Sequence, residues 1–476
     1  MKLQTSEIIP LSKPKTRRKT RTVVAIVALA FILTIIPLYF PYSQNYNQLS
    51  LSFQIGFQSL DHNSIRSTTT PPQPNNPNLR DEASEDSPKN IPPDAAAATS
   101  ANSTSSNEKR GDGREGKRTS DAVVKEKKKC DLFSGEWVPN PDGPYYTNTT
   151  CYSIQDHQNC MRFGRPDLGF MKWRWKPDEC ELPLFDPIGF LELVRGKSLA
   201  FVGDSVARNH MQSLICLLST VGHPVDMSKP KAGNRLYVYT EYNFNISIIS
   251  SPYLIRTEKT VPGDFATPFN LFLDEFDQTW TGKIHTFDYI IISAGQWFFR
   301  PSYFYLNRTL IGCLYCPEAN VTHLPSAFSY RWAFRTAFRA INGGAGVAFL
   351  RTLAPSHFEG GPWDKGGDCV RTGPYKRNET GLEEYNMEMY SVQLEEMRIA
   401  QKAGRGTGGK LRLFDATNMM VLRPDGHPSK YGHWPVANRT IPNDCVHWCL
   451  PGPIDAWNDL LQELLKREVK KKSKIT

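Results

Sequence analysis

Cysteine is absent from the first 129 residues of this 476-residue chain, although ten cysteines follow. Large apolar side chains are also sparse between residues 41 and 129, where Ser, Thr, Asn, Pro and charged residues predominate. A segment with so little to bury cannot build a packed core. We therefore expect residues 41–129 to form a disordered stem and the folded part of the protein to begin near Cys130.

Charge is missing from residues 22–40, an apolar run about long enough to span the hydrocarbon core of a membrane. The basic residues just before it are Lys13, Lys15, Arg17, Arg18, Lys19 and Arg21. By the positive-inside rule, residues 1–21 are a cytosolic tail and everything after the span is lumenal. A cleaved signal peptide is the alternative, but the run is long for one, and prolines and aromatic residues occupy the place of a cleavage site. We favour a single-pass type II signal anchor.

Beyond the stem, basic residues scarcely outnumber acidic ones. Residues 1–129 hold 19 Lys and Arg against 12 Asp and Glu, which leaves 38 against 36 from Cys130 onward. Because neutralising phosphates requires a concentrated basic surface, this balance argues against nucleic acid as a partner. The late cluster of basic residues is expected to be solvated, and we assign residues 471–476 to a basic tail.

The cysteines all lie on the lumenal side of the predicted anchor: Cys130, Cys151, Cys160, Cys180, Cys216, Cys313, Cys316, Cys369, Cys445 and Cys449. An even number in an oxidising compartment predicts disulfides. Zinc bound by the Cys313-x-x-Cys316 pair is the alternative, but no second pair of this kind completes four ligands, so we expect no metal site. A location in the secretory pathway is consistent with the sequons at Asn102, Asn148, Asn245, Asn307, Asn320, Asn378 and Asn438.

Short apolar runs alternate with helical patterns in the rest of the chain. Strands are expected at residues 199–202 and from residues 287, 346 and 411, and helices near residues 326–341, 382–402 and 455–466. Continuously apolar strands between helices predict an α/β fold, an open parallel sheet flanked by helices. We assign residues 184–470 to this domain. Residues 130–183, aromatic and rich in cysteine, are predicted to form an N-terminal subdomain stapled by disulfides.

The run LAFVGDSVARNHMQSLICLL, residues 199–218, places Ser205 between a predicted strand and a predicted helix. Such a turn exposes a hydroxyl at the carboxyl edge of the sheet, where helical N–H groups stabilise negative charge. Ser205 is therefore either a nucleophile or merely a helix cap. A nucleophilic serine needs a histidine and usually a carboxylate. The best candidates are His447 and Asp444, which lies three residues earlier and can face the same site.

Other histidines offer alternatives. His427, in RPDGHP with Asp425, is a rival base, but Asp-Gly followed by His-Pro more naturally forms a tight turn. His357 follows a strand end and could line the cleft, although a structural role is favoured. Trp297, Phe298, Phe299 and Trp363 are candidates for stacking on sugars or for packing in the core, with Phe298 the strongest core candidate.

Gly203-Asp204-Ser205 followed by Asp444-x-x-His447 resembles the GDSL/SGNH hydrolase pattern. The block DCVHWCLPGPIDAWN, residues 444–458, is similar to the signature of the plant trichome-birefringence-like proteins. The likeness extends through CDLFSGEWV, RFGRPDLGFMKWRWKPDECELPLFD, GQWFFRP and VLRPDGHP and covers residues 130–465. The resemblance implies an SGNH-hydrolase-like fold in a type II Golgi membrane protein that O-acetylates cell-wall polysaccharide. GQWFFRP and TIPNDC are most similar to the xyloglucan O-acetyltransferase branch; mannan and xylan are the alternative acceptors.

The resemblance assigns the catalytic triad to Ser205, His447 and Asp444. His447 would deprotonate Ser205, which would take the acetyl group from a donor, and a sugar hydroxyl would then accept it from the acetyl-serine. The donor would be a co-substrate of unknown identity, acetyl-CoA or a compound derived from it, with no bound cofactor. Nothing in the sequence indicates an oligomeric state.

The oxyanion hole departs from the family pattern. The backbone N–H of Ser205 is one candidate donor, and SGNH enzymes add a glycine and an asparagine, but the corresponding stretch here, SAGQW, has no asparagine. Arg208 and Asn209, in the first turn after Ser205, are the alternatives. The candidate oxyanion and substrate residues are therefore Gly203, Asp204, Arg208, Asn209, Gly295, Gln296 and Trp297.

Two further classes of function remain open. A polysaccharide acetylesterase would use the same triad with water as the acceptor. A non-catalytic protein that binds wall polysaccharide would keep the aromatic residues and have no need of Ser205. The presence of serine, histidine and aspartate argues against this second class.

Overall fold

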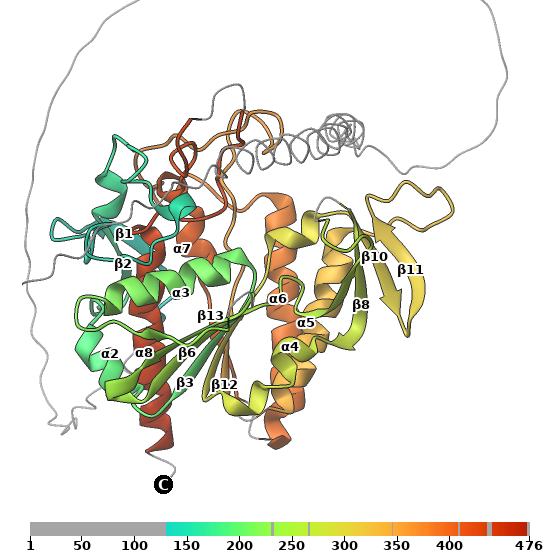
Figure 1. Ribbon diagram of the computed structural model, residues 1–476, viewed down its shortest axis with the longest axis horizontal. Helices are drawn as coiled ribbons and strands as arrows, with labels where there is room; N and C mark the ends of the chain where they lie inside the picture. Colours follow the sequence, from blue (N-terminus) through green and yellow to red (C-terminus); the bar gives the residue numbers. More distant parts are fainter. Residues whose placement is uncertain are drawn as a thin grey trace, which may run out of the picture. The chain divides into compact units, whose positions relative to one another are not determined.

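A seven-stranded mixed sheet lies at the centre of the computed structural model, with helices on both of its faces (Figure 1). The structure describes residues 130–473, except 230–232, 265–266, 345, 408–409 and 436–439. The predicted cytosolic tail, anchor and stem lie outside these residues. Within the described part, no helix is long and apolar enough to cross a membrane.

The sheet has strand order β13-β12-β9-β3-β6-β5-β4. These strands are β13 (Leu411–Phe414), β12 (Val347–Arg351), β9 (Tyr289–Ser293), β3 (Ser198–Gly203), β6 (Phe244–Ser250), β5 (Arg235–Tyr239) and β4 (Val225–Asp226). The five strands from β13 to β6 are parallel, and they include all four predicted strands. The prediction of an entirely parallel sheet is wrong, because β5 runs antiparallel to both of its neighbours, β6 and β4. Only a short turn, residues 240–243, joins β5 to β6, and a parallel crossover needs a longer connection.

Alternate residues of each parallel strand face opposite layers of helices. Leu199 and Phe201 of β3 belong to the core on one side, and Ala200 and Val202 to the core on the other. The first layer contains α2 (Pro187–Leu193), α3 (Ser205–Leu218) and α8 (Ala456–Lys472), and the second contains α5 (Ser326–Asn342) and α6 (Glu384–Ala403). The short helices are α4 (Gln278–Thr281) and α7 (Thr417–Val421).

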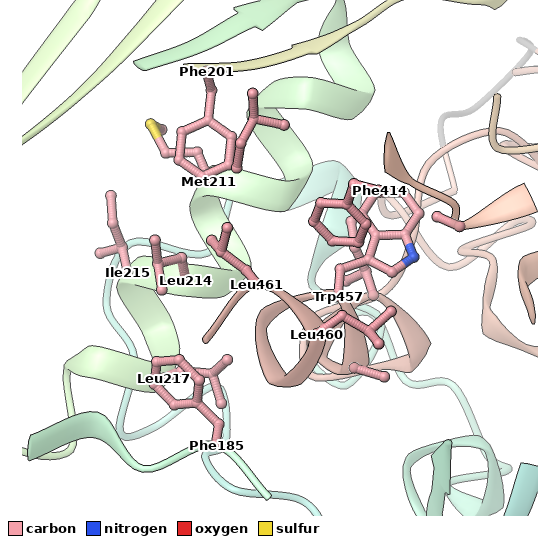
Figure 2. Packing of buried hydrophobic residues seen from close by; sticks show 14 of the residues in the cluster. Phe185, Phe201, Met211, Leu214, Ile215, Leu217, Phe414, Trp457, Leu460 and Leu461 are labelled. Atoms are coloured by element: carbon pink, nitrogen blue, oxygen red, sulfur yellow. The ribbon is translucent and has the colours of Figure 1, made fainter. Parts of the chain in front are cut away.

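The contact between α3 and α8 fixes the helix that begins at Ser205. Figure 2 shows Met211 of α3 beside Phe201 of β3, and Leu214 of α3 near Leu461 of α8. All these side chains are buried. Burial of a large aliphatic side chain contributes about 1.5–3 kcal/mol, so this layer holds α3 firmly against the sheet.

The last helix is longer than the sequence predicted. Helix α8 continues to Lys472, so the expected boundary of the basic tail at residue 471 falls inside it. Arg467 pairs with Glu463 at 3.0 Å and Lys471 with Glu468 at 2.7 Å. Basic residues assigned to a solvated tail thus belong to a helix whose other face is buried.

A second, four-stranded sheet was not predicted. Its order is β11-β10-β8-β7, with β11 (Thr309–Leu314), β10 (Ser302–Leu306), β8 (Phe269–Phe276) and β7 (Ile255–Lys259). Helix α5 packs on it, and the Thr336 hydroxyl donates to the Leu273 carbonyl at 2.7 Å. The sequence signal was weak because these strands are only partly buried and carry polar residues.

Five disulfides join all ten cysteines, which confirms the prediction of disulfides. The segment 130–183 contains a two-stranded antiparallel sheet, β1 (Gly135–Pro139) and β2 (Trp173–Pro177), closed by Cys130–Cys180. Two bridges, Cys151–Cys216 and Cys160–Cys449, tie this segment to the catalytic domain. The described residues form one compact unit, so the segment is part of the same body as the central sheet.

Candidate active site

Ser205 is the first residue of α3 and follows directly on the carboxyl end of β3. A side chain at Gly203 would place its Cβ 1.9 Å from the Ser293 carbonyl oxygen, so only glycine lets β3 and β9 approach here. Asp204, and not Ser205, is the N-cap: its Oδ1 accepts from the N–H of Val206 at 3.0 Å. Ser205 is therefore freed from capping and keeps its hydroxyl for another partner.

His447 connects Ser205 to Asp444. Its Nε2 lies 2.7 Å from Ser205 Oγ, and its Nδ1 lies 2.8 Å from Asp444 Oδ2. Since a carboxylate accepts, Nδ1 carries the proton and Nε2 is left to accept the proton of the serine hydroxyl. The side chains of His447 and Asp444 are 20% and 25% exposed, so the site is sheltered but reachable. The three residues predicted as a triad are brought together in the geometry of a serine nucleophile.

The turn that carries His447 is fixed from several sides. Asp444 Oδ1 accepts from the backbone N–H of His447 at 2.9 Å and of Val446 at 3.1 Å. The backbone of Asp444 exchanges two hydrogen bonds with that of Ser429. The disulfides Cys369–Cys445 and Cys160–Cys449 anchor both ends of the turn. The imidazole is thus held in one orientation by chain segments from three parts of the sequence.

The charges of the triad reinforce one another. Burial alone would lower the pKa of His447, but the negative charge and hydrogen bond of Asp444 outweigh burial and raise it. Burial would likewise raise the pKa of Asp444, yet the charge of His447 and three hydrogen bonds hold that pKa well below its usual range. Asp444 is therefore ionised throughout the physiological range and stabilises the imidazolium that forms when Ser205 loses its proton.

His427 is not the base. Its ring is fully buried, Nδ1 donates to the His447 carbonyl at 2.7 Å, and Nε2 lies 2.7 Å from Nδ1 of His357. The ring also stacks on Trp448, with centroids 4.1 Å apart. Burial lowers the pKa of both His427 and His357. The two histidines hold the catalytic turn in place through the His447 carbonyl and the Trp448 ring, which agrees with the structural role favoured for His357.

Several oxyanion candidates have other partners. The N–H of Gly295 donates to Asp204 Oδ2 at 3.1 Å, which ties the turn after β9 to the cap of α3. The Gln296 amide faces the carbonyl of Ala354 at 3.4 Å. Asn209 is fully buried, and its side chain bonds the backbone of Trp448 through both its oxygen and its nitrogen. Asn209 and Gly295 therefore hold the site together instead of facing a substrate.

Two hydrogen-bond donors beside Ser205 are left without partners among the described residues. The backbone N–H of Ser205 has no acceptor there, and neither has the guanidinium of Arg208, which lies one turn further along α3. Arg208 is half-buried, and its positive charge lowers the pKa of both His447 and His157, so it is close to both rings. These groups can face a developing negative charge at Ser205.

The aromatic candidates differ in whether they pack inside the protein or face solvent. Phe298 is buried against Tyr330, as expected for a core residue, and Trp297 packs edge-on against Tyr253 and Phe269. Phe299 packs on Tyr385. Trp363, in contrast, is 55% exposed. Among the four aromatic residues singled out in the sequence, Trp363 is the one that offers a sugar an open face.

No sequence motif pointed to His157, which lies beside the triad. Its ring centroid is 5.0 Å from that of His447, in an edge-to-face arrangement. His157 comes from the Cys-rich segment, which is joined to the catalytic turn by the Cys160–Cys449 disulfide and by the Leu450 N–H, which donates to the Gln158 carbonyl at 2.8 Å. Trp434 was also missed; it is 57% exposed and packs on Phe163 of the same segment.

Within the part of the chain that the structure describes, one cluster of metal-ligand type is found, and it lies outside the active site. It consists of Cys313, Cys316 and His323, and the His323 Nε2 is 3.9 Å from the Cys316 sulfur. The two cysteines are joined to each other as a disulfide, so of the three residues His323 is the one still able to act as a metal ligand. The arrangement fits a bridge that closes the loop after β11 better than it fits zinc.

The sheet, the strand-to-helix turn and the triad define a serine enzyme of the acyl-transfer and ester-cleavage class. Family comparison finds the GDSL/SGNH-like acyl-esterase family found in Pmr5 and Cas1p over residues 182–464, and the PMR5 N terminal domain over residues 128–181. The chain belongs to this family of acyl-esterase-like enzymes.

The chain is similar to several plant proteins. The chain is 56% identical to Protein trichome birefringence-like 20 of Arabidopsis thaliana over 72% of this chain and 74% of that one. It is 45% identical to Xyloglucan O-acetyltransferase 4 of Populus trichocarpa, over 72% of this chain and 82% of the relative. It is also 41% identical to xyloglucan O-acetyltransferase 2 of Arabidopsis thaliana, over 71% and 83% of the two chains.

Proposed function

We propose that the protein is an O-acetyltransferase that moves acetyl groups to hydroxyls of a plant cell-wall polysaccharide, by double displacement through an acetyl-Ser205 intermediate. The observation that carries the proposal is the position of His447, hydrogen-bonded to Ser205 on one side and to Asp444 on the other. The names of relatives at 41–45% identity support transfer to xyloglucan. Xylan and mannan are the alternative acceptors.

In the first half-reaction His447 Nε2 takes the proton of Ser205, and Oγ attacks the acetyl carbonyl of the donor. The tetrahedral intermediate collapses, His447 returns the proton to the leaving group, and acetyl-Ser205 remains. In the second half-reaction Nε2 takes the proton of a sugar hydroxyl, whose oxygen attacks the acetyl-serine. Ser205 leaves as an alkoxide and recovers the proton from His447. Asp444 stays ionised and stabilises the imidazolium in both steps.

The oxyanion in each step is proposed to lie between the Ser205 backbone N–H and the Arg208 guanidinium. Both donors are unpartnered in the described structure and belong to the first turn of α3. The positive end of the helix dipole acts in the same place. Arg208 thus takes the role for which the family pattern would use an asparagine.

The acceptor is proposed to lie along the exposed aromatic residues on either side of the catalytic turn. The loop of Trp363 is tied to that turn by Cys369–Cys445 and by the Asn443 side chain, which donates to the Gly367 carbonyl at 3.0 Å. Trp434 follows the segment that pairs with Asp444 at Ser429. Indole faces held in this way can stack on the apolar C–H faces of a polymer.

The location is proposed to be the Golgi membrane, with a single type II span and a lumenal catalytic part. Five disulfides and the sequons agree with an oxidising lumen. In sealed vesicles the catalytic part should resist added protease until detergent is present, and its glycans should be removed by endoglycosidase. Digestion without detergent would refute this orientation.

The central experiment incubates the full-length protein with an acetyl donor and with xyloglucan, xylan or mannan oligosaccharides. Acetyl-CoA and 4-nitrophenyl acetate serve as donors, because the natural co-substrate is unknown. Mass spectrometry then compares acetylated sugar with free acetate. Acetyl-sugar from one polymer class supports transfer and identifies the acceptor, whereas free acetate alone would identify an acetylesterase. Binding without either product would leave a polysaccharide-binding protein.

A further inference from the structure

His157 lies against the catalytic histidine but belongs to a different part of the chain. The Ser205, His447, Asp444 and Arg208 side chains all come from the portion matched by the acyl-esterase family, residues 182–464. His157 comes from the preceding segment, residues 128–181. The edge-to-face contact between the two rings, with centroids 5.0 Å apart, places an imidazole next to the point where Nε2 exchanges protons.

The ring of His157 has one nitrogen engaged and one available. Nε2 lies 3.3 Å from the Gln158 side-chain amide, while Nδ1 has no partner among the described residues and is not buried. Burial, followed by the charge of His447, lowers the pKa of His157 to about 4. His157 is therefore a neutral imidazole at the pH of the secretory pathway, and Nδ1 can form one hydrogen bond with an incoming ligand.

The first half-reaction does not require this group. The triad supplies the nucleophile and base, and the first turn of α3 supplies oxyanion donors, so the acyl-esterase portion is complete for forming acetyl-Ser205. A transferase must additionally favour a sugar hydroxyl over water in the second half-reaction. The group added beside His447 by the Cys-rich segment is suited to that task.

An exposed tryptophan on which a sugar can stack lies close to His157 in the chain fold. Gly432 packs against the backbone of His157, since a Cβ at Gly432 would lie 3.1 Å from the His157 carbonyl oxygen. Trp434, two residues further on, is exposed. A sugar ring stacked on Trp434 would therefore lie on the side of the site where His157 is found.

We propose that His157 is an acceptor-binding residue, whose Nδ1 hydrogen-bonds an oxygen of the acceptor sugar and so directs the sugar hydroxyl, in place of water, to His447 and acetyl-Ser205. The inference rests on the proposed acetyl-serine mechanism and adds to it a device that separates transfer from hydrolysis. No atom of His157 changes its covalent bonds in the reaction.

The test uses full-length protein, 4-nitrophenyl acetate as donor and a xyloglucan oligosaccharide as acceptor. The nitrophenolate burst measures formation of acetyl-Ser205, and mass spectrometry measures the ratio of acetylated sugar to acetate. His157→Phe keeps a ring against His447 without a hydrogen bond, His157→Asn keeps a polar atom near the position of Nδ1, and His157→Ala keeps neither. His285→Ala, an exposed histidine before β9 at the opposite edge of the sheet, is the matched control.

We expect the burst rate of all three variants to stay within about twofold of the wild type. The ratio of transfer to hydrolysis should fall on the order of fivefold to tenfold in His157→Ala and His157→Phe, as for the loss of one hydrogen bond. His157→Asn should recover most of the ratio, and His285→Ala should leave it unchanged. An unchanged ratio in His157→Phe would overturn the proposal, and so would equal slowing of burst and transfer, which would mean that His157 only supports His447.

The two proposals fail in different ways. A wild-type protein without an acetyl adduct on Ser205 would refute the proposed mechanism before His157 is considered. A wild-type protein that acetylates Ser205 and transfers to sugar, with variants of unchanged ratio, would refute the role of His157 alone.

Discussion

Asn209 and Trp448 exchange two hydrogen bonds: the Trp448 N–H donates to Asn209 Oδ1 at 2.7 Å, and Asn209 Nδ2 donates to the Trp448 carbonyl at 3.2 Å. Asn209 lies one turn after Ser205 on α3, and Trp448 follows His447. The pair therefore sets the distance between the nucleophile and its base. Because both residues are buried, water cannot replace either bond.

Asn209→Ala should cost about 1–3 kcal/mol of folding stability, since it leaves a buried N–H and a buried carbonyl without partners. It should also slow formation of acetyl-serine more than this loss of stability explains, because His447 is no longer held at Ser205. Thermal melts and burst kinetics below the unfolding temperature measure the two effects separately. A variant that melts early yet reacts at the wild-type rate would show that the clamp is only structural.

Ser205→Ala should abolish acetyl transfer while leaving melting temperature and glycan binding nearly unchanged, because one partly exposed oxygen is lost. His447→Ala should be about as damaging, and the double variant scarcely worse, since members of a triad act as a unit. With donor alone, an acetyl group should appear on the peptide that contains Ser205, and it should disappear when glycan is added. An adduct on another residue would reject the mechanism.

The active site was predictable where function depends on local sequence. The apolar run of β3, the Gly-Asp-Ser turn and the periodic face of α3 are neighbours in the chain, and Asp444 precedes His447 by three residues. These patterns made Ser205, His447 and Asp444 candidates, and the family resemblance assigned them as a triad. The role of Asp204 as the cap in place of Ser205 follows from backbone geometry, which the sequence leaves open.

Contacts between distant segments were not predictable. From the sequence alone Asn209 could equally be an oxyanion donor, and only its contacts with Trp448 show its structural role. His157 lies in no recognisable motif. The second sheet and the β5–β6 pair have half-exposed strands, so they lack the continuous apolar pattern that revealed β3 and β9. Disulfides join segments that are far apart in the chain, and their connectivity cannot be deduced from the order of the cysteines.

Asp444→Asn should change the pH dependence as well as the rate. Activity requires neutral His447, so it is lost as pH falls through the pKa of His447, which Asp444 raises. With asparagine this pKa drops, and the acidic limb of the pH–rate profile should move to lower pH. The plateau rate should fall roughly 10³- to 10⁴-fold, because the ring is no longer held in the productive tautomer. An unmoved acidic limb would contradict the role assigned to Asp444.

The disulfides should differ in their importance for activity. Cys160–Cys449 joins residues 289 apart in sequence and holds the chain just after His447, whereas Cys313–Cys316 spans only three positions in the second sheet. Replacing both members of the first pair with serine should cost about 2–5 kcal/mol and most of the activity. The same change in the second pair is the control and should leave the burst rate intact. Equal losses of activity in both would argue against a special role for Cys160–Cys449.

Arg208 provides the sharpest test of the oxyanion site. It is three residues after Ser205, hence on the same face of α3, and its guanidinium has no partner within the described residues. Removing a donor from an oxyanion hole typically slows the reaction about 10²- to 10³-fold, so Arg208→Met should slow the burst by that factor and Arg208→Lys by less. Because the charge of Arg208 lowers the pKa of His447, Arg208→Met should also shift the acidic limb of the pH–rate profile upward. Arg195→Met, an arginine paired with Glu192 on the surface, is the control and should change neither quantity. A wild-type burst rate in Arg208→Met would leave the Ser205 backbone N–H as the donor that remains on α3 and would remove Arg208 from the mechanism.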